Sequence, residues 1–136
     1  MSIESIGTEL ASAISNISGL TVYSPTQLRD AIEPPCAMVI AGEIGYHPTM
    51  SGDGVADLTY RVLLAIMKGD SPAALSQLMP YLEMTGNYSV KAKVEADRTL
   101  NASAADCKVE KSTGQGIVTW NGTTYIGSEF TVSVWQ

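Results

Sequence analysis

The chain has 136 residues, of which 45% are hydrophobic and only 16% are charged. Soluble domains usually have about 25% charged residues, so charge is scarce here. The length fits one domain, residues 1–136, with a substantial core, and the apolar content excludes a disordered chain. The net charge of −6 argues against a protein whose own field attracts nucleic acid or anionic lipid.

Targeting signals and cysteine chemistry are also constrained by the sequence. The longest apolar stretch, residues 62–67, is far shorter than the roughly 20 residues of a membrane-spanning helix. Glu4 and Glu9 stand where a signal peptide needs basic residues, so we expect no signal peptide. Cys36 and Cys107 fit neither a disulfide framework nor a metal-binding spacing, and we expect both to be reduced and buried.

The first third of the chain predicts a helix followed by two strands. Residues 2–17 carry apolar side chains at a spacing of three and four, which predicts an amphipathic helix that ends before Gly19. Residues 20–23 predict a short strand, and the apolar run 37–41 is typical of a strand covered on both faces. Residues 42–54 contain four glycines, and we expect a long loop or a splayed hairpin arm there.

A long strand and two helices are predicted next. Alternate residues of the strand form a wholly apolar face that we assign to the core: Leu58, Tyr60, Val62, Leu64 and Ile66. Residues 71–82 predict a helix that starts at the Ser71-Pro72 pair and contains no charged residue. Pro80 should kink this helix or its last turn. A short helix is predicted over residues 90–98.

The last third predicts β structure. Apolar and polar residues alternate over 105–111, and Asn121-Gly122 between two β-rich runs is the signature of a type I′ hairpin turn. With that turn, Val118 pairs with Tyr125. The expected fold is therefore a single α+β domain. It has a mostly antiparallel sheet with a C-terminal Asn-Gly hairpin, packed against an N-terminal helix and one or two central helices.

The predicted hairpin has two unlike faces. One is expected to face the core: Ile117, Thr119, Thr124, Ile126, Phe130, Val132 and Val134. The other is largely aromatic: Val118, Trp120, Tyr125, Glu129 and Trp135. Glu129 is the only charged residue in 112–136, whereas a sheet face in water is normally rich in Lys and Glu. We therefore expect a helix or another subunit to cover the aromatic face.

The sequence offers little catalytic chemistry. His47 is the single histidine, and no nucleophile, phosphate-loop or zinc motif accompanies it. Residues 51–57 lack the alternating oxygen donors of a calcium loop, so a plain turn is the better interpretation. We expect no enzyme, no cofactor and no metal site.

Five segments, taken in order, carry a resemblance to a known family. They are GLTVY at 19–23, PPCAMV at 34–39, TYRVLL at 59–64, SVKAKVEAD at 89–97 and YIGSEFTV at 125–132. With the N-terminal helix and the long loop, they make the chain resemble the tail terminator (tail completion) proteins of long-tailed bacteriophages, especially those of actinobacterial hosts. The resemblance covers nearly the whole chain, although Pro80 departs from the family's pattern.

The resemblance implies a virion structural protein with an α+β fold. Such proteins form a ring, a hexamer, on the head-proximal end of the tail tube, stop its polymerisation and offer a surface for head joining. The implied partners are other copies of the chain, the tail tube protein and the head-tail connector, with no membrane. DNA passes through the lumen without specific binding. The implied location is the virion tail, and the host cytoplasm during assembly.

Two surfaces and a loop are our own candidates for the contacts of such a ring. The candidate subunit interface comprises Leu75, Leu78 and Met79 of the uncharged helix with Val118, Trp120, Tyr125 and Trp135 of the hairpin. The candidate docking loop for the tube or connector comprises Tyr46, His47, Met50 and Asp53. Two alternatives stay open: another phage connector or neck protein, and a small cytoplasmic ligand-binding or enzymatic α+β domain that uses the loop around His47.

Overall fold

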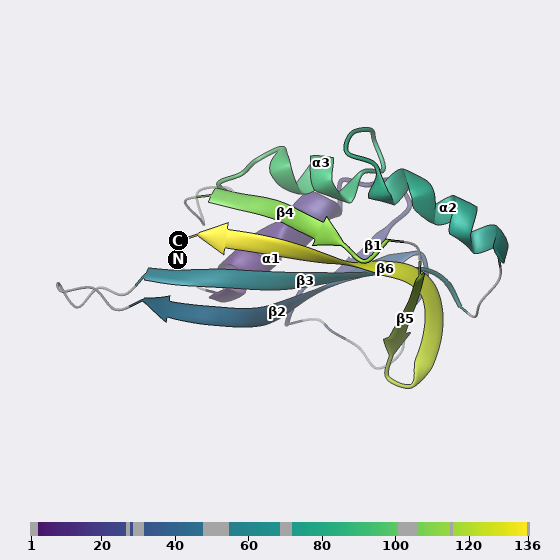
Figure 1. The fold of residues 1–136 in the computed structure, drawn as a ribbon, viewed down its shortest axis with the longest axis horizontal. Coiled ribbons are helices and arrows are strands. Elements are labelled where there is room, and N and C mark those ends of the chain that lie inside the picture. The colour runs from purple at the N-terminus through teal and green to yellow at the C-terminus, as the bar shows by residue number, and fades with distance from the viewer. Residues whose placement is uncertain are drawn as a thin grey trace.

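The computed structural model describes residues 3–26, 28, 32–47, 55–68, 72–100, 106–114 and 116–135. Its elements are α1 (Ile3–Ile14), β1 (Thr21–Tyr23), β2 (Cys36–His47), β3 (Val55–Lys68), α2 (Pro72–Leu82), α3 (Val90–Glu95), β4 (Asp106–Ser112), β5 (Gly116–Trp120) and β6 (Thr123–Trp135). Within these residues one six-stranded sheet has the order β1-β2-β3-β6-β4, and β5 pairs with β6. All its strand pairs are antiparallel except β1 with β2 (Figure 1). The predicted α+β class is confirmed.

The main core lies between one face of the sheet and the three helices. Ile6, Leu10 and Ile14 lie one helical turn apart on α1 and are fully buried there, as their spacing predicts. The α1 helix ends at Ile14 rather than at residue 17, and Ile17 continues into a turn by donating its N–H to the Ile14 carbonyl at 3.0 Å. The apolar face predicted for β3 is confirmed, since all five of its residues belong to this core.

The β2 strand is longer than the sequence predicts. Residues 42–47 extend it as one arm of a hairpin with β3, so the loop prediction is wrong there, and the alternative of a hairpin arm is confirmed for these residues. A register shift between Ala41 and Ile44 accommodates Gly42, where an added Cβ would lie 2.8 Å from the Thr59 carbonyl oxygen. The glycines that favoured a loop thus fit a bulged strand with a close backbone approach.

The two central helices start where the sequence places them. The α2 helix begins at Pro72 and ends at Leu82, with Pro80 in its last turn. The α3 helix begins after Ser89, whose Oγ accepts a hydrogen bond from the Ala92 N–H at 3.1 Å. It ends at Glu95, three residues before the predicted end.

The C-terminal hairpin has the predicted register. Val118 lies opposite Tyr125, and the turn residues Asn121 and Gly122 have φ angles of 49° and 81°. Both central residues therefore adopt the left-handed region that a type I′ turn requires.

The β6 strand changes neighbours along its length. Its C-terminal part pairs with β4 and its N-terminal part with β5, while β3 lies along its other side. Thr113, which lies between β4 and β5, binds β6 at the point where one neighbour gives way to the other. Its N–H donates to the Glu129 carbonyl at 2.9 Å, and its Oγ1 accepts from the Glu129 N–H at 3.1 Å. At Gly127 the backbones approach so closely that an added Cβ would lie 1.7 Å from the Leu64 carbonyl oxygen. Beyond this point β6 curves together with β5 out of the line of the other strands (Figure 1), while Ile126 and Tyr125 stay paired with Met67 and Lys68 at the end of β3.

The curvature of the β5–β6 hairpin creates a second core cluster, on the side of the sheet away from the helices. Its members are Tyr23, Ile32, Cys36, Met38, Leu63, Ala65, Val118 and Tyr125. Val118 is 7% exposed and Tyr125 is 5% exposed, because the hairpin packs these side chains onto β2 and β3 of its own chain. The prediction that a helix or another subunit covers this face is therefore wrong for the hairpin. Conversely, Ile117, predicted to face the core, is 63% exposed.

Candidate interaction surfaces

The predicted interface residues of α2 separate into buried and exposed ones. Leu78 is fully buried in the main core, so its prediction as a surface contact is wrong: it belongs to the helix stripe that packs on the sheet. Met79, one position further round the helix, is exposed. Leu75 also lies on α2, but its side chain is outside the described part of the chain.

Two further apolar residues are exposed just beyond α2. Met84 is 72% exposed, and Tyr88 is also exposed and packs edge-on against Tyr81 with ring centroids 5.9 Å apart. Burial, and secondarily the proximity of Tyr88, raises the pKa of Tyr81. We call Met79, Met84 and Tyr88 the α2 patch. Met84 and Tyr88 could not be predicted as exposed contacts, because they follow the helix and belong to no periodic pattern.

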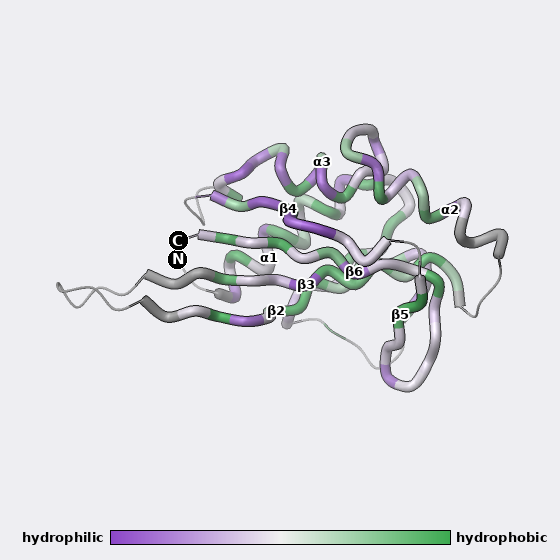
Figure 2. Tube along the Cα trace, in the orientation of Figure 1, coloured by the Kyte–Doolittle hydropathy of each residue, from purple (hydrophilic) through white to green (hydrophobic). Residues whose placement is uncertain are grey.

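A second neutral surface lies on the outer side of the β5–β6 hairpin. Ile117, Thr119 and Thr124 are exposed there, and Thr119 lies opposite Thr124 in the ladder. None of the three is charged, and the hairpin is white to green in Figure 2 apart from its turn. We call these residues the hairpin patch. These three residues take the place of Val118, Tyr125 and Trp120 as candidate contacts of the hairpin. Val118 and Tyr125 point the other way into the second core cluster, and Trp120 packs partly against it.

Trp135 belongs to neither patch. It lies ten positions from Tyr125 along β6, roughly 30 Å at the rise of an extended strand. Its ladder partners are Asp57 on β3 and Asp106 on β4, and its side chain is 37% exposed. The predicted aromatic face is therefore not one exposed surface, because Val118 and Tyr125 are buried in the second core cluster while Trp135 is exposed far along β6.

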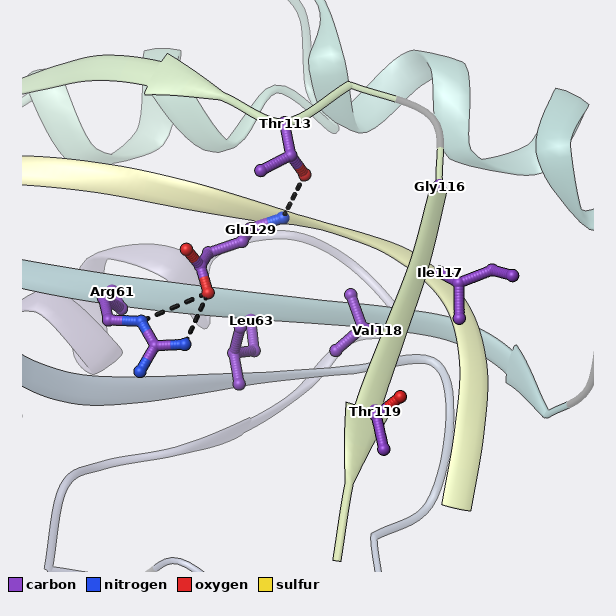
Figure 3. Close-up of a pocket in the computed structure, with 8 residues that line it drawn as sticks. All are labelled: Arg61, Leu63, Thr113, Gly116, Ile117, Val118, Thr119 and Glu129. Atoms are coloured by element: carbon purple, nitrogen blue, oxygen red, sulfur yellow. Dashed lines mark hydrogen bonds and ion pairs between the residues drawn. The ribbon is translucent and has the colours of Figure 1, made fainter. Parts of the chain in front are cut away.

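A cavity of about 340 Å³ opens between β3 and β5 (Figure 3). Arg61 and Glu129 lie at one side of it, and Leu63 and Val118 supply its apolar wall. The Arg61 Nη2 lies 2.6 Å from the Glu129 Oε1, and the Arg61 Nε lies 3.1 Å from the same oxygen. The two charges compensate each other, so the cavity offers mainly hydroxyl and apolar contacts.

This ion pair was not predicted from the sequence, although a signal existed. Arg61 is the only charged residue in the stretch 59–67, and Glu129 is the only one in 112–136. Two isolated opposite charges on strands that pair side by side are expected to meet when the register brings them together.

The predicted docking loop falls mostly outside the described residues. Tyr46 and His47 form the end of β2, but their side chains lie outside the description, as do Met50 and Asp53 entirely. Within the described ranges no group of three His, Cys, Asp or Glu side chains is placed to hold a metal ion. No helix in the same ranges is long and apolar enough to cross a membrane.

No family model matches the chain, and no curated protein shows significant similarity to it.

Proposed function

We propose that the protein is a virion structural protein that assembles as a hexameric ring on the head-proximal end of a phage tail tube. There it ends tail polymerisation and provides the surface for head joining. The resemblance of the five sequence segments supports the family, and two separate neutral patches on one subunit support the ring. Its partners are further copies of itself, the tail tube protein and the head-tail connector, and DNA passes through the lumen without specific binding.

The observation that carries the ring is the placement of the two patches. A closed ring needs two different surfaces on each subunit that fit each other. The α2 patch lies on the side of the main core, to which α2 contributes Leu78, whereas the hairpin patch belongs to the hairpin that covers the second cluster. The two patches are therefore formed by different elements, a helix with the segment after it and a hairpin, and they have no residue in common. Contact between the α2 patch of one subunit and the hairpin patch of the next joins subunits head to tail.

The chemistry of the patches favours a contact driven by apolar burial. Met84 and Ile117 are the most exposed large apolar side chains in the described ranges. Full burial of such a side chain contributes about 1.5–3 kcal/mol. Because neither patch contains a charged residue, we expect assembly to depend little on ionic strength.

Variants of each patch test the ring. Met84→Lys and Ile117→Lys each place a charge in one half of the contact and should both stop ring formation, as measured by light scattering after size exclusion. Ser12→Lys is the matched control, because Ser12 is exposed on α1, outside both patches. Mixing the two patch variants leaves one intact contact and should yield a 1:1 dimer but no ring. Rings formed by either patch variant alone would contradict the assignment.

Electron microscopy of phage lysates that lack the protein tests the role in the virion. Overlong tails without heads support a terminator, because nothing then stops tube growth. Tails of normal length beside filled heads favour a connector or neck protein and would contradict the proposal.

A further inference from the structure

The β4 strand forms one end of the sheet. Within the described residues it pairs with β6 on one side and with no strand on its other side. Such an edge presents backbone N–H groups to which a strand of another chain can add. The hydrogen bonds of β4 show that two of these groups already have acceptors.

Two successive outward amides of β4 bind side-chain carboxylates. The Val109 N–H donates to the Glu95 Oε2 at 3.1 Å, and the Cys107 N–H donates to the Asp106 Oδ1 at 2.9 Å. Residues two apart in a strand direct their N–H groups to the same edge. Both amides thus lie on the side of β4 that faces away from β6.

A basic side chain holds each carboxylate in place. The Lys91 Nζ lies 2.6 Å from the Glu95 Oε2, one helical turn away on α3. Arg98 donates to both oxygens of Asp106, at 2.8 and 2.9 Å. Paired carboxylates of this kind accept the stronger, charge-assisted class of hydrogen bond.

The rest of the strand is also unsuited to pairing with another chain. The register shifts between Val109 and Lys111, and a bulge of this kind disrupts the ladder that an added strand would need. Lys108, Glu110 and Lys111 are exposed, and Figure 2 shows hydrophilic residues concentrated along α3 and β4. Charged side chains at an edge discourage pairing.

We propose that Glu95 and Asp106 close the β4 edge against strand addition by a second copy of the chain. Copies of the protein then associate through other surfaces and not by extending the sheet at β4. This inference does not rest on the proposed function, because the edge is closed whether the working form is a ring or a monomer.

Removal of each of the two carboxylates, Glu95 and Asp106, tests the proposal. In Glu95→Ala, hydrogen exchange of the Val109 amide should be about tenfold faster than in the wild type, because a hydrogen bond to a charged group is lost. Exchange at Cys107 should change little, and Asp106→Ala should show the reverse. The double variant should reach a higher mass than the wild type as its concentration rises, and the Cys107 and Val109 amides should regain protection in the associated form.

Two further variants provide the controls. Glu110→Ala removes a neighbouring exposed carboxylate that binds neither amide, and its mass should stay that of the wild type. Glu95→Gln keeps an oxygen acceptor for Val109 and should also keep the wild-type mass. A double variant that folds, by its circular dichroism, and keeps the wild-type mass at every concentration would overturn the proposal. Association of Glu95→Gln/Asp106→Ala as strong as that of the double alanine variant would also overturn it.

Discussion

Arg61 on β3 and Glu129 on β6 form an ion pair in which one carboxylate oxygen accepts hydrogen bonds from both Nε and Nη2 of the guanidinium. The pair lies at the point where β6 exchanges β4 for β5 as its neighbour, and the Glu129 backbone is bonded to Thr113 there. It marks the start of the bend that carries the hairpin over the second core cluster.

This ion pair should contribute little to stability. The side chains of Arg61 and Glu129 are 46% and 30% exposed, so water screens their attraction. Arg61→Ala, Glu129→Ala and the double variant should give a coupling energy of about 0.2–1 kcal/mol in a double-mutant cycle from urea unfolding. A much larger coupling energy would mean that the pair determines the bend, rather than the backbone geometry at Gly127.

Gly127 should be essential for the bend. An added Cβ would overlap the Leu64 carbonyl oxygen, which belongs to the backbone of β3 and cannot rotate away. Gly127→Ala should destabilise the fold by more than about 3 kcal/mol, or prevent folding. Gly116 is the matched control, because it lies opposite Gly127 in the ladder and an added Cβ there meets no atom within 4 Å. Equal melting temperatures for the two alanine variants would contradict the close approach.

Val118 should behave as a core residue. Val118→Ala removes buried methyl groups from the second cluster and should cost about 2 kcal/mol of the free energy of unfolding, measured by urea denaturation. Thr119→Ala, on the exposed side of the same strand, should change it by less than about 0.5 kcal/mol. If the two costs were reversed, the hairpin would present its other face to the core.

The two cysteines should be unreactive in the folded protein. Burial raises the pKa of Cys36 to about 11, and burial followed by the charge of Asp106 raises the pKa of Cys107 to about 11. Both thiols therefore stay neutral at pH 8, and a thiol reagent should modify them only after denaturant is added. Rapid modification of the native protein would contradict their burial.

The same pKa shifts give a direction for stability against pH. In the unfolded chain a thiol ionises near pH 8.5, so the unfolded state releases these protons first as the pH rises. The free energy of unfolding should therefore fall between about pH 8.5 and about pH 11. Cys36→Ser and Cys107→Ser should each weaken this dependence. A pH dependence in this range that neither variant alters would show that other groups cause it.

The elements that could be predicted from the sequence are those with local causes. The stripe of α1, the apolar face of β3 and the cap of α3 by Ser89 each depend on the spacing of neighbouring residues. The hairpin register follows from the Asn121-Gly122 turn, because that turn type fixes which residues lie opposite one another.

The features that could not be predicted depend on contacts distant in the sequence. The alternation of residues 117–134 predicts which side chains share a face of a flat sheet. The close backbone approach at Gly127 bends β6, and on β5 it is then Val118 that is buried and Ile117 that is exposed. The extension of β2 through residues 42–47 depends on pairing with β3. Of the predicted interface residues of α2 with described side chains, Met79 is exposed and Leu78 is not, because the helix directs Leu78 into the core.

The mass of the protein in solution tests the central claim most directly. Light scattering across a concentration series should show a species of six 14.4 kDa chains, about 86 kDa, that persists in high salt because its contacts are apolar. Met84→Lys and Ile117→Lys should each abolish it. A wild-type protein that stays at 14.4 kDa at every concentration would contradict the ring.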